Sequence, residues 1–362
     1  MAEIKTTDLL VVGGGAAGLC AAAEAASHGA RVTILESDLH LGGQLVKQTH
    51  KFFGSKDEHA GTRGYKIADI ILNEIRGCGD KVEAYTNTAA VGYYKNDGIV
   101  TVMKGEEEYF KIKPQKMVMA TGAQERIIPF PNNDIPGVYG AGAVQTLMNV
   151  YGVVPGKRVL MIGAGNIGLI VSYQLMQAGV EIAAVLEALP KIGGYWVHAA
   201  KIRRLGVPIL LRHTIKAALG TEVVDGAVIQ NIDTGELSHV ECDVICLAVG
   251  LTPTNEMLWQ AGCDMKFIPQ LCGHVPMRDR KLRTSHPDIW IAGDAAGIEE
   301  ASAAMVEGRI AGLAAAEALG FAVDQDKFGE YQERLNSLRR GEAGEKIRSG
   351  LALAQVADWG DN

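Results

Sequence analysis

The sequence predicts an α/β protein in which one domain of parallel strands and helices is inserted into another. A buried strand, a glycine-rich loop, a helix and a second strand follow one another at residues 8–36 and again at 158–187. Another buried strand, followed by an Ala-rich helix, occupies 289–318. The chain has 362 residues, enough for two domains that each bury a core. We expect both to be Rossmann-like, with three layers.

The first pattern has the order that dinucleotide binding requires. Its loop is Gly13-Gly14-Gly15-Ala16-Ala17-Gly18. Gly13 permits the tight turn, Gly15 lets the backbone approach a pyrophosphate, and Gly18 lets the helix pack against the strand. The helix N-terminus faces the phosphates, and Glu36, at the end of the second strand, can accept hydrogen bonds from a ribose. The alternative is a glycine-rich turn in some other α/β protein.

The second pattern repeats this device in the inserted domain. Its loop is Gly163-Ala164-Gly165-Asn166-Ile167-Gly168, and the following strand ends in Glu187. An acid at that point favours NAD over NADP because it would repel a 2′-phosphate, although Lys191 lies nearby in the sequence. The alternative is that this second site holds another nucleotide or none.

Two further strands end in residues suited to a bound nucleotide. The strand 116–120 ends in Thr121-Gly122, and the strand from 289 ends in Gly293-Asp294. Carboxyl ends of parallel strands meet ligands in such folds. A carboxylate there can bind a ribitol hydroxyl, and the N-terminus of the Ala-rich helix can face a flavin edge. Before them, short alternating segments at 82–85, 89–94, 99–103 and 109–112 predict an antiparallel meander.

Composition excludes several classes of protein. The net charge of -7 gives no reason to expect nucleic acid. No apolar run reaches the ~20 residues of a membrane span, and acids precede the first apolar stretch, so we expect no secretion signal and a cytoplasmic protein. The six cysteines form no CxxC pair. Cys263, Cys272 and His274 match no common zinc spacing, so we expect no metal.

These motifs, in this order, resemble the two-dinucleotide-domain FAD/NAD(P) oxidoreductases of the pyridine nucleotide-disulfide type, which include thioredoxin reductase. The resemblance implies an FAD domain at 1–125 and 256–320, an inserted NAD domain at 126–255, and a charged helical extension at 321–362. It implies FAD contacts from Gly13, Gly15, Ala16, Ala17, Gly18, Glu36, Gly43, Gln44, Ala90, Ala120, Thr121, Gly122, Gly293, Asp294, Glu300 and Ala301, and NAD(H) contacts from Gly163, Gly165, Asn166, Gly168, Glu187 and Gly250.

One absence argues against a disulfide reductase. Such enzymes need two cysteines close in sequence against the flavin. Here Gly42-Gly43-Gln44 leads to no cysteine, and the stretch 135–151 contains none.

A narrower resemblance concerns the segment after the Thr-Gly strand. Residues 120–126 (ATGAQER), 129–131 (PFP), 135–139 (IPGVY) and 141–145 (AGAVQ) are similar to alpha-type subunits of heteromeric proline, hydroxyproline, opine or sarcosine dehydrogenases and to hydrogen cyanide synthase B-type subunits. In that family a D-amino-acid-oxidase-type flavoprotein beta subunit usually oxidises the substrate. Longer relatives carry a cysteine-rich [2Fe-2S] extension, whereas residues 321–362 contain no cysteine.

The resemblance implies an FAD-dependent, NAD-linked electron-transfer subunit of an amine or amino-acid dehydrogenase. Its partners would be this beta subunit and a small iron-sulfur subunit, and those chains would carry FMN or [2Fe-2S]. If there is no iron-sulfur subunit, the electrons stay on flavin and NAD. Rival hypotheses are a self-sufficient NADH:acceptor oxidoreductase and a redox-silent structural subunit. Flavin chemistry needs no acid or base from the protein, so we assign no catalytic residue. Lys47 and His50 are the candidates to test if one exists.

Overall fold

The computed structural model describes residues 4–52, 54–357 and 359. The chain forms two compact units, and the second interrupts the first. The first unit comprises Met1–Gln124 and Thr252–Asn362, and the second comprises Glu125–Leu251. The strands β7 (Ala123–Glu125) and β16 (Leu251–Pro253) pair where the chain passes from one unit to the other.

The first unit is built on a mixed sheet. Its parallel part has the order β3 (Val82–Tyr85), β2 (Val32–Leu35), β1 (Ile4–Val12) and β6 (Glu108–Met119), with β19 (Ile289–Ile291) on the far side of β6. The antiparallel strands β5 (Ile99–Lys104) and β4 (Thr88–Tyr94) continue from β6. Consequently β6 pairs with β5 through its first half and with β19 through its second half.

Two strand predictions were wrong. The segment 82–85 is not in the meander: it is the parallel edge strand β3, and its exposed position explains polar residues such as Glu83. The segments 109–112 and 116–120 are not separate, because both belong to the continuous strand β6. Pro114 lies between the part of β6 that pairs with β5 and the part that pairs with β19, so its missing N–H interrupts neither ladder.

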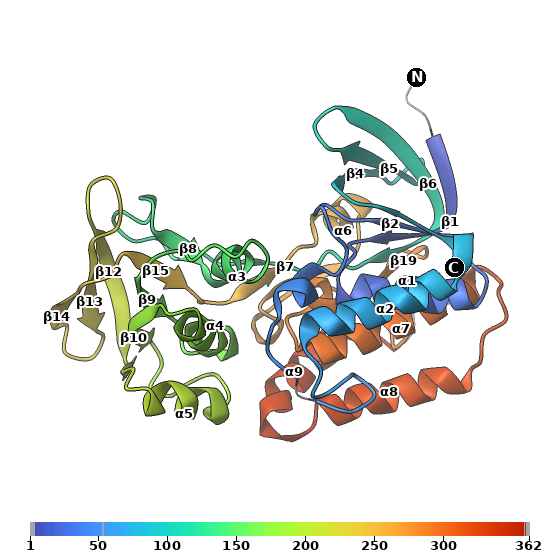
Figure 1. The fold of residues 1–362 in the computed structure, drawn as a ribbon. Coiled ribbons are helices and arrows are strands. Elements are labelled where there is room, and N and C mark those ends of the chain that lie inside the picture. Colours follow the sequence, from blue (N-terminus) through green and yellow to red (C-terminus); the bar gives the residue numbers. More distant parts are fainter. Residues whose placement is uncertain (1–3, 53, 358, 360–362) are drawn as a thin grey trace. The chain divides into compact units, whose positions relative to one another are not determined.

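Helices cover one face of this sheet. They are α1 (Ala16–Ser27), α2 (Gly64–Gly77) and α7 (Ala301–Ala318), as Figure 1 shows. At Gly308 and Gly312 of α7, a Cβ atom would lie 2.1 and 2.3 Å from backbone oxygens of α1. The two helices thus pack almost backbone to backbone, which is why their sequences are rich in Ala and Gly. On the other face, the meander and α6 (Glu256–Ala261) enclose a second core.

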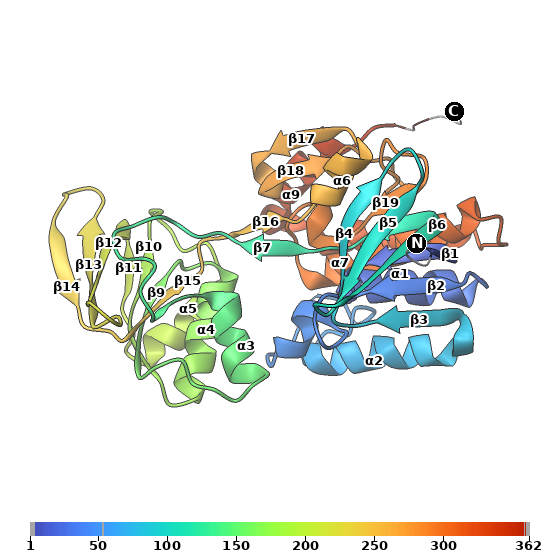
Figure 2. The ribbon, with the colours of Figure 1, turned by 90° about the horizontal axis from the view of Figure 1, so that it is seen from above.

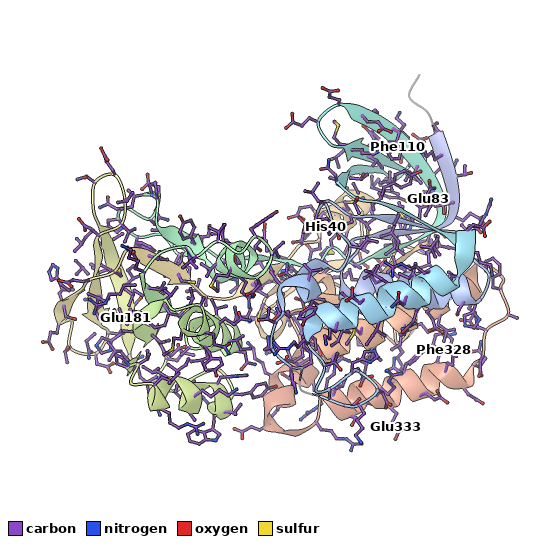
Figure 3. All side chains as sticks on the ribbon, in the orientation of Figure 1. His40, Glu83, Phe110, Glu181, Phe328 and Glu333 are labelled. Atoms are coloured by element: carbon purple, nitrogen blue, oxygen red, sulfur yellow. The ribbon has the colours of Figure 1, made fainter. Side chains whose placement is uncertain are left out.

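The C-terminal extension folds onto the helical layer. It contains α8 (Asp326–Leu338) and α9 (Gly341–Ala354), in agreement with the helical prediction for 321–362; residues 358 and 360–362 of that range lie outside the described residues. Tyr331 and Leu335 of α8 are buried in the core between the helices. Phe328 packs against the same core while Glu333 is exposed (Figure 3). Short elements complete the unit: η1 (Gly43–Lys47), η2 (Gly79–Lys81), β17 (Met265–Ile268), η3 (Pro269–Leu271), β18 (Gly273–Pro276) and η4 (Gly293–Ala296).

The second unit has three layers of its own (Figure 2). A parallel sheet has the order β11 (Ile209–Leu211), β10 (Glu181–Glu187), β9 (Arg158–Ile162), β15 (Val244–Leu247) and β8 (Val138–Gly140). One face carries α3 (Ala141–Asn149), α4 (Asn166–Gln177) and α5 (Trp196–Arg204), and the other carries the antiparallel strands β12 (His213–Leu219), β13 (Gly226–Asn231) and β14 (Leu237–Val240). The predicted α/β class with two Rossmann-like units is confirmed.

Candidate dinucleotide-binding sites

The first glycine loop connects the ends of β1 and β2 with the start of α1. The Gly13 N–H donates to the Leu35 oxygen at 2.8 Å, and the Leu19 N–H begins the helix by donating to the Gly15 oxygen at 2.9 Å. Gly13 has a φ of 104°, a conformation that side chains rarely adopt. The described residues provide no side-chain cap for α1, so its first N–H groups face the space in front of the loop.

Three of the four glycines in this loop, Gly13, Gly15 and Gly18, meet very different surroundings. A Cβ atom at Gly13 would lie 2.2 Å from the Ala120 oxygen, and one at Gly18 would lie 1.8 Å from the Gly13 oxygen. The fold itself therefore requires these two glycines. A Cβ at Gly15 would meet nothing closer than the Gly43 Cα at 3.8 Å, an ordinary contact. The packing of the described chain therefore does not require glycine at position 15. A ligand whose phosphate group comes close to the backbone here would require it.

Glu36 is oriented toward this loop by backbone donors. Its Oε2 accepts from the Gly14 N–H and its Oε1 from the Asp38 N–H, both at 2.8 Å. The residue is 7% exposed. A carboxylate has about four acceptor positions, so one held in this way can still accept hydroxyl groups from a ribose.

Other predicted residues gather around the loop. The Gly42 N–H donates to the Gly14 oxygen at 2.8 Å and brings Gly43 next to Gly15. At Gly293, a Cβ would lie 2.9 Å from the Ala17 Cβ, so the η4 turn packs against the start of α1. Gly43 and Gly293 therefore lie against the loop and the start of α1, which begins at Ala16, and the Ala120 oxygen lies against Gly13, while Gln44 is exposed.

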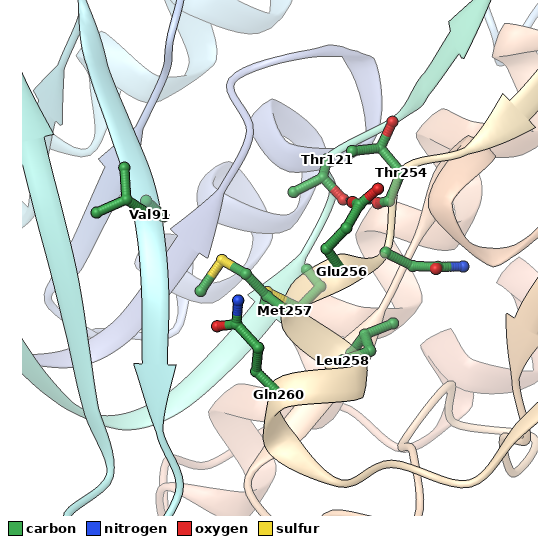
Figure 4. Close-up of a pocket in the computed structure, with 10 residues that line it drawn as sticks. Val91, Thr121, Thr254, Glu256, Met257, Leu258 and Gln260 are labelled. Carbon is green, nitrogen blue, oxygen red and sulfur yellow. Dashed lines mark hydrogen bonds between the residues drawn. The ribbon is translucent and has the colours of Figure 1, made fainter.

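Ala90 and Thr121 lie at a different place, a cavity of about 160 Å³ (Figure 4). The Thr121 hydroxyl donates to the Thr254 oxygen, and the Thr254 N–H donates to the Gly122 oxygen at 3.0 Å. Figure 4 shows Met257 of α6 on the opposite wall from β4. Sequence reasoning missed the cavity residues from 254 to 260, because it assigned 254 and 255 to the inserted domain and saw no motif after them.

Asp294 lies in a partly buried, acidic environment. Burial, together with the nearby carboxylates of Glu307, Glu299 and Glu300, raises the pKa of its carboxyl group to about 7. The Glu299 N–H donates to Asp294 Oδ1 at 3.2 Å and opposes this shift. Glu300 precedes α7, and its oxygen accepts the first N–H groups of that helix, so Glu300 and Ala301 mark the helix N-terminus beside the turn.

The second loop repeats the bonds of the first. The Gly163 N–H donates to the Leu186 oxygen at 2.8 Å. Glu187 accepts from the Ala164 N–H and the Leu189 N–H, both at 3.0 Å. The Ala248 N–H donates to the Ile162 oxygen at 2.7 Å, as the Ala120 N–H does to Val12 at 2.8 Å in the first unit. The segment ending at Gly250 is therefore the counterpart of the segment ending at Gly122.

The glycines of this loop follow the same rule. A Cβ at Gly163 would lie 2.2 Å from the Ala248 oxygen, and one at Gly168 would lie 2.1 Å from the Gly163 oxygen. At Gly165 no described atom other than its chain neighbours and its own helix backbone lies within 4 Å of that position. A second double-glycine segment covers the loop, since the Gly194 N–H donates to the Ala164 oxygen at 2.9 Å. Asn166 fixes this segment by accepting the Tyr195 N–H at 2.7 Å.

Two such loops in one chain agree with a comparison against protein families. Residues 7–308 match the family described as pyridine nucleotide-disulphide oxidoreductase. The chain belongs to this family. Membership implies binding of FAD and NAD(P).

Several curated proteins are similar to this chain over most of its length. One opine oxidase subunit, from Agrobacterium tumefaciens (strain Ach5), is 28% identical over 92% of this chain and 70% of its own length. The HcnB subunit of hydrogen cyanide synthase from Pseudomonas protegens is 25% identical over 84% of the chain and 69% of its own length. The alpha subunit of sarcosine oxidase from Corynebacterium sp. (strain P-1) is 28% identical over 87% of the chain, which spans only 33% of that protein.

Solved structures share the fold. L-proline dehydrogenase from P. horikoshii has a TM-score of 0.70 at 23% identity, covering 92% of this chain and 59% of that one. Thioredoxin reductase from T. acidophilum has a TM-score of 0.73 at 21% identity, covering 87% of this chain and 99% of that one. At these identities the likeness concerns the fold alone.

The remaining sequence candidates were weighed for a metal site or for acid–base chemistry. Cys263 is buried beside the Thr284 hydroxyl, and the His274 ring contacts Trp259 and Phe267. Among the described residues no group of three or more His, Cys, Asp or Glu could hold a metal ion. The partly buried His50 ring stacks on Phe52, with centroids 5.6 Å apart. No helix within the described part of the chain is long and apolar enough to cross a membrane.

Sequence reasoning also missed a buried ionic cluster under the η4 turn. It contains Glu307 in the middle of α7, with Glu299, Arg278 and Arg339. The available signal was Glu307 in the middle of an Ala-rich helix that also carries Arg309 and Glu317, because charged residues are rarely buried unless they are paired. Nothing in the spacing of the sequence indicates its partners, which come from other segments.

Proposed function

We propose that this chain is an FAD-containing, NAD-linked electron-transfer subunit, of the alpha type, in a heteromeric amine or amino-acid dehydrogenase. The observation that carries the proposal is the pair of glycine loops with matching hydrogen bonds. Each loop contains one glycine, Gly15 or Gly165, that the packing of the chain does not require and that a ligand would require. The curated relatives support the subunit role, because each is named as one subunit of an oxidase or synthase.

In this proposal FAD occupies the first unit. The pyrophosphate would lie against Gly15 and the N-terminus of α1, a ribose would bind Glu36, and Asp294 would bind the ribityl chain. Bound flavin supplies the hydride and electron chemistry, which the protein side chains lack. The chain's own residues bind and orient it. Glu36 accepts hydroxyl groups, and the α1 dipole stabilises the phosphate charge by roughly 0.3–1 kcal/mol.

The second unit would bind NAD(H) in preference to NADP(H). Glu187 is held by two backbone donors, as Glu36 is, and its carboxylate would repel a 2′-phosphate. Lys191, four positions after Glu187 in the sequence, is exposed, and its positive charge works against this preference.

We further propose that the chain is not a disulfide reductase. A reactive thiol needs access and a lowered pKa. Cys20, Cys242, Cys246 and Cys263 are buried, and burial raises the pKa of Cys20 and of Cys242 to about 11. Such thiols stay protonated at neutral pH.

The proposed partners are a D-amino-acid-oxidase-type beta subunit, which oxidises the substrate, and a small iron-sulfur subunit. The hetero-oligomer would assemble in the cytoplasm, whose reducing conditions suit a chain in which none of the six cysteines forms a disulfide. The chain spans 59% of the proline dehydrogenase chain and 33% of the sarcosine oxidase subunit, so the substrate of the whole assembly is part of the proposal.

An anaerobic titration of the purified chain with NADH tests the proposed function. Bleaching of the long-wavelength flavin band is expected, with one NADH per flavin, and NADPH is expected to require a much higher concentration. Bleaching followed by rapid turnover with an added dye and no partner would instead support a self-sufficient NADH:acceptor oxidoreductase. Bound flavin that ignores NADH would contradict the NAD-linked role and support a redox-silent subunit.

A further inference from the structure

A buried ionic cluster holds the η4 turn from below. Glu307, 3% exposed, accepts the Gly293 N–H through Oε2 at 2.9 Å. Arg278, 4% exposed, donates through Nη1 to the Ala296 oxygen at 2.6 Å. The Glu299 N–H donates to Asp294 Oδ1 at 3.2 Å. Three of the four residues of the turn are therefore fixed by residues of the cluster.

Arg339, which follows α8 in the C-terminal extension, joins these contacts. Its guanidinium donates to both carboxylate oxygens of Glu299, at 2.8 and 2.7 Å, and to Glu307 Oε1 at 2.6 Å. One side chain thus bridges the residue that contacts Gly293 and the residue that contacts Asp294. The planar guanidinium suits this arrangement because it donates several hydrogen bonds in fixed directions.

We propose that Arg339 is a positioning residue for the flavin, acting through Glu299 and Glu307 on the Gly293-Asp294 pair. The inference rests on the proposed function, in that FAD is taken to occupy the first unit. It gives the C-terminal extension a role: through Arg339 the extension holds the residues that position the η4 turn, without contacting the cofactor itself.

The charges of the cluster explain why Arg339 matters. Asp294, Glu299 and Glu307 supply three carboxylates, and two guanidinium groups contact the last two: Arg339 contacts Glu299 and Glu307, and Arg278 contacts Glu307. Without Arg339, Arg278 is the guanidinium left beside Glu307, and it lies 3.8 Å away. Unpaired buried carboxylates repel one another and take up protons, so the turn would shift.

The test compares variants of the full chain that differ in where they weaken the extension. Arg339→Met removes the bridge, and Arg339→Lys keeps a cation that can bond one carboxylate. Lys327→Met is the matched control: Lys327 is also on the extension and pairs with Glu24 at 3.0 Å, far along α1 from the glycine loop. FAD affinity is measured by quenching of FAD fluorescence in the apoprotein, with the visible flavin spectrum and a thermal unfolding curve for each variant.

Arg339→Met is expected to raise the FAD dissociation constant at least tenfold and to alter the vibronic shape of the flavin band. Arg339→Lys should recover at least threefold of that loss, and Lys327→Met should stay within twofold of the wild type. The double variant Glu299→Gln with Arg339→Met removes one buried carboxylate along with the guanidinium. It should unfold near the wild-type temperature yet still bind FAD weakly, which keeps the test valid if Arg339→Met alone does not fold.

Two results would overturn the inference while leaving the proposed function intact. One is wild-type FAD affinity in Arg339→Met or in the double variant. The other is an equal loss in Arg339→Met and Lys327→Met, which would mean that the extension only needs to be docked. A wild-type chain that binds no FAD would instead refute both this inference and the proposed function.

Discussion

Gly15 and Gly165 provide the sharpest test of the two proposed dinucleotide sites. Gly165, in the proposed NAD loop, serves as the example. Gly165→Ala adds a methyl group where no described atom beyond its chain neighbours and own helix lies within 4 Å, on a backbone with φ −74° and ψ 179° that alanine adopts readily. Alanine is a poorer N-cap than glycine, so we expect a loss of about 1 kcal/mol or less in the free energy of unfolding.

The effect on the dinucleotide should be much larger than the effect on the fold. The methyl group would occupy the space that a pyrophosphate needs to reach the N–H groups of α4. Overpacking of this kind costs about 1–3 kcal/mol, which corresponds to a roughly 5- to 150-fold increase in the dissociation constant of NADH.

Gly168→Ala is the contrasting variant. Its Cβ would lie 2.1 Å from the Gly163 oxygen, whereas ordinary contacts begin at 3.4 Å, so α4 would have to move away from β9 by about 1 Å. We expect this variant to lose about 1–3 kcal/mol or more of unfolding free energy, along with nucleotide binding.

Both variants are measured by urea unfolding and by the NADH titration of the flavin band. Gly165→Ala should separate the two readouts, with a near-normal unfolding midpoint and a shifted titration. A normal titration in Gly165→Ala would refute the placement of a pyrophosphate at this loop. A normal unfolding midpoint in Gly168→Ala would show that the helix does not need its close approach to the strand.

Three further predictions follow from packing and burial. Gly312→Ala should lower the free energy of unfolding, because its Cβ would lie 2.3 Å from a backbone oxygen of α1. Gly329→Ala in α8, where no described atom other than its chain neighbours and its own helix backbone lies within 4 Å of the new Cβ, should instead raise the free energy of unfolding by about 0.5–1 kcal/mol through helix propensity. Equal shifts of the two variants in urea unfolding would contradict this contrast. For Asp294, the folded pKa of about 7 lies above the ordinary value of 3.8, so its protonation favours the folded apoprotein. The stability it contributes should be present below about pH 4 and lost as the pH rises to about 7, and the stability difference between wild type and Asp294→Asn should follow that course in urea unfolding at several pH values. A difference independent of pH would show that Asp294 titrates normally. Finally, a thiol reagent should modify the partly exposed Cys78 and Cys272 first in the native chain, and rapid loss of all six thiols would be inconsistent with the burial described.

Local signals allowed much of the fold to be predicted. The strand Arg158–Ile162 begins the pattern predicted at 158–187, and the helix Ala301–Ala318 ends the range predicted at 289–318, because short apolar runs and Ala-rich stretches are bounded by glycines or polar residues there. The acids Glu36 and Glu187 were found by their position at the end of a strand. Each of these features depends on residues close together in the sequence.

Features that depend on distant residues could not be predicted in this way. The parallel pairing of β3 with β2 joins Val32 to Val82, and nothing in the exposed, alternating sequence of β3 distinguishes it from a meander strand. The bridge from Arg339 to Glu299 spans forty positions, and a charged helical tail is more often a solvated face. Periodicity indicates which side of an element is buried but not which element covers it.

The interrupted first unit has a consequence for biosynthesis. Its sheet is completed by β19 and its helical layer by α7, and both are made only after the whole second unit has been translated. At roughly 5–20 residues per second, the ribosome takes on the order of 15–55 s to proceed from the first glycine loop to Gly293. During that time α1 exposes the apolar surface that α7 later covers. The second unit can fold first, whereas the first unit must wait for its last segments, so nascent chains stalled before α7 should be the ones that engage chaperones.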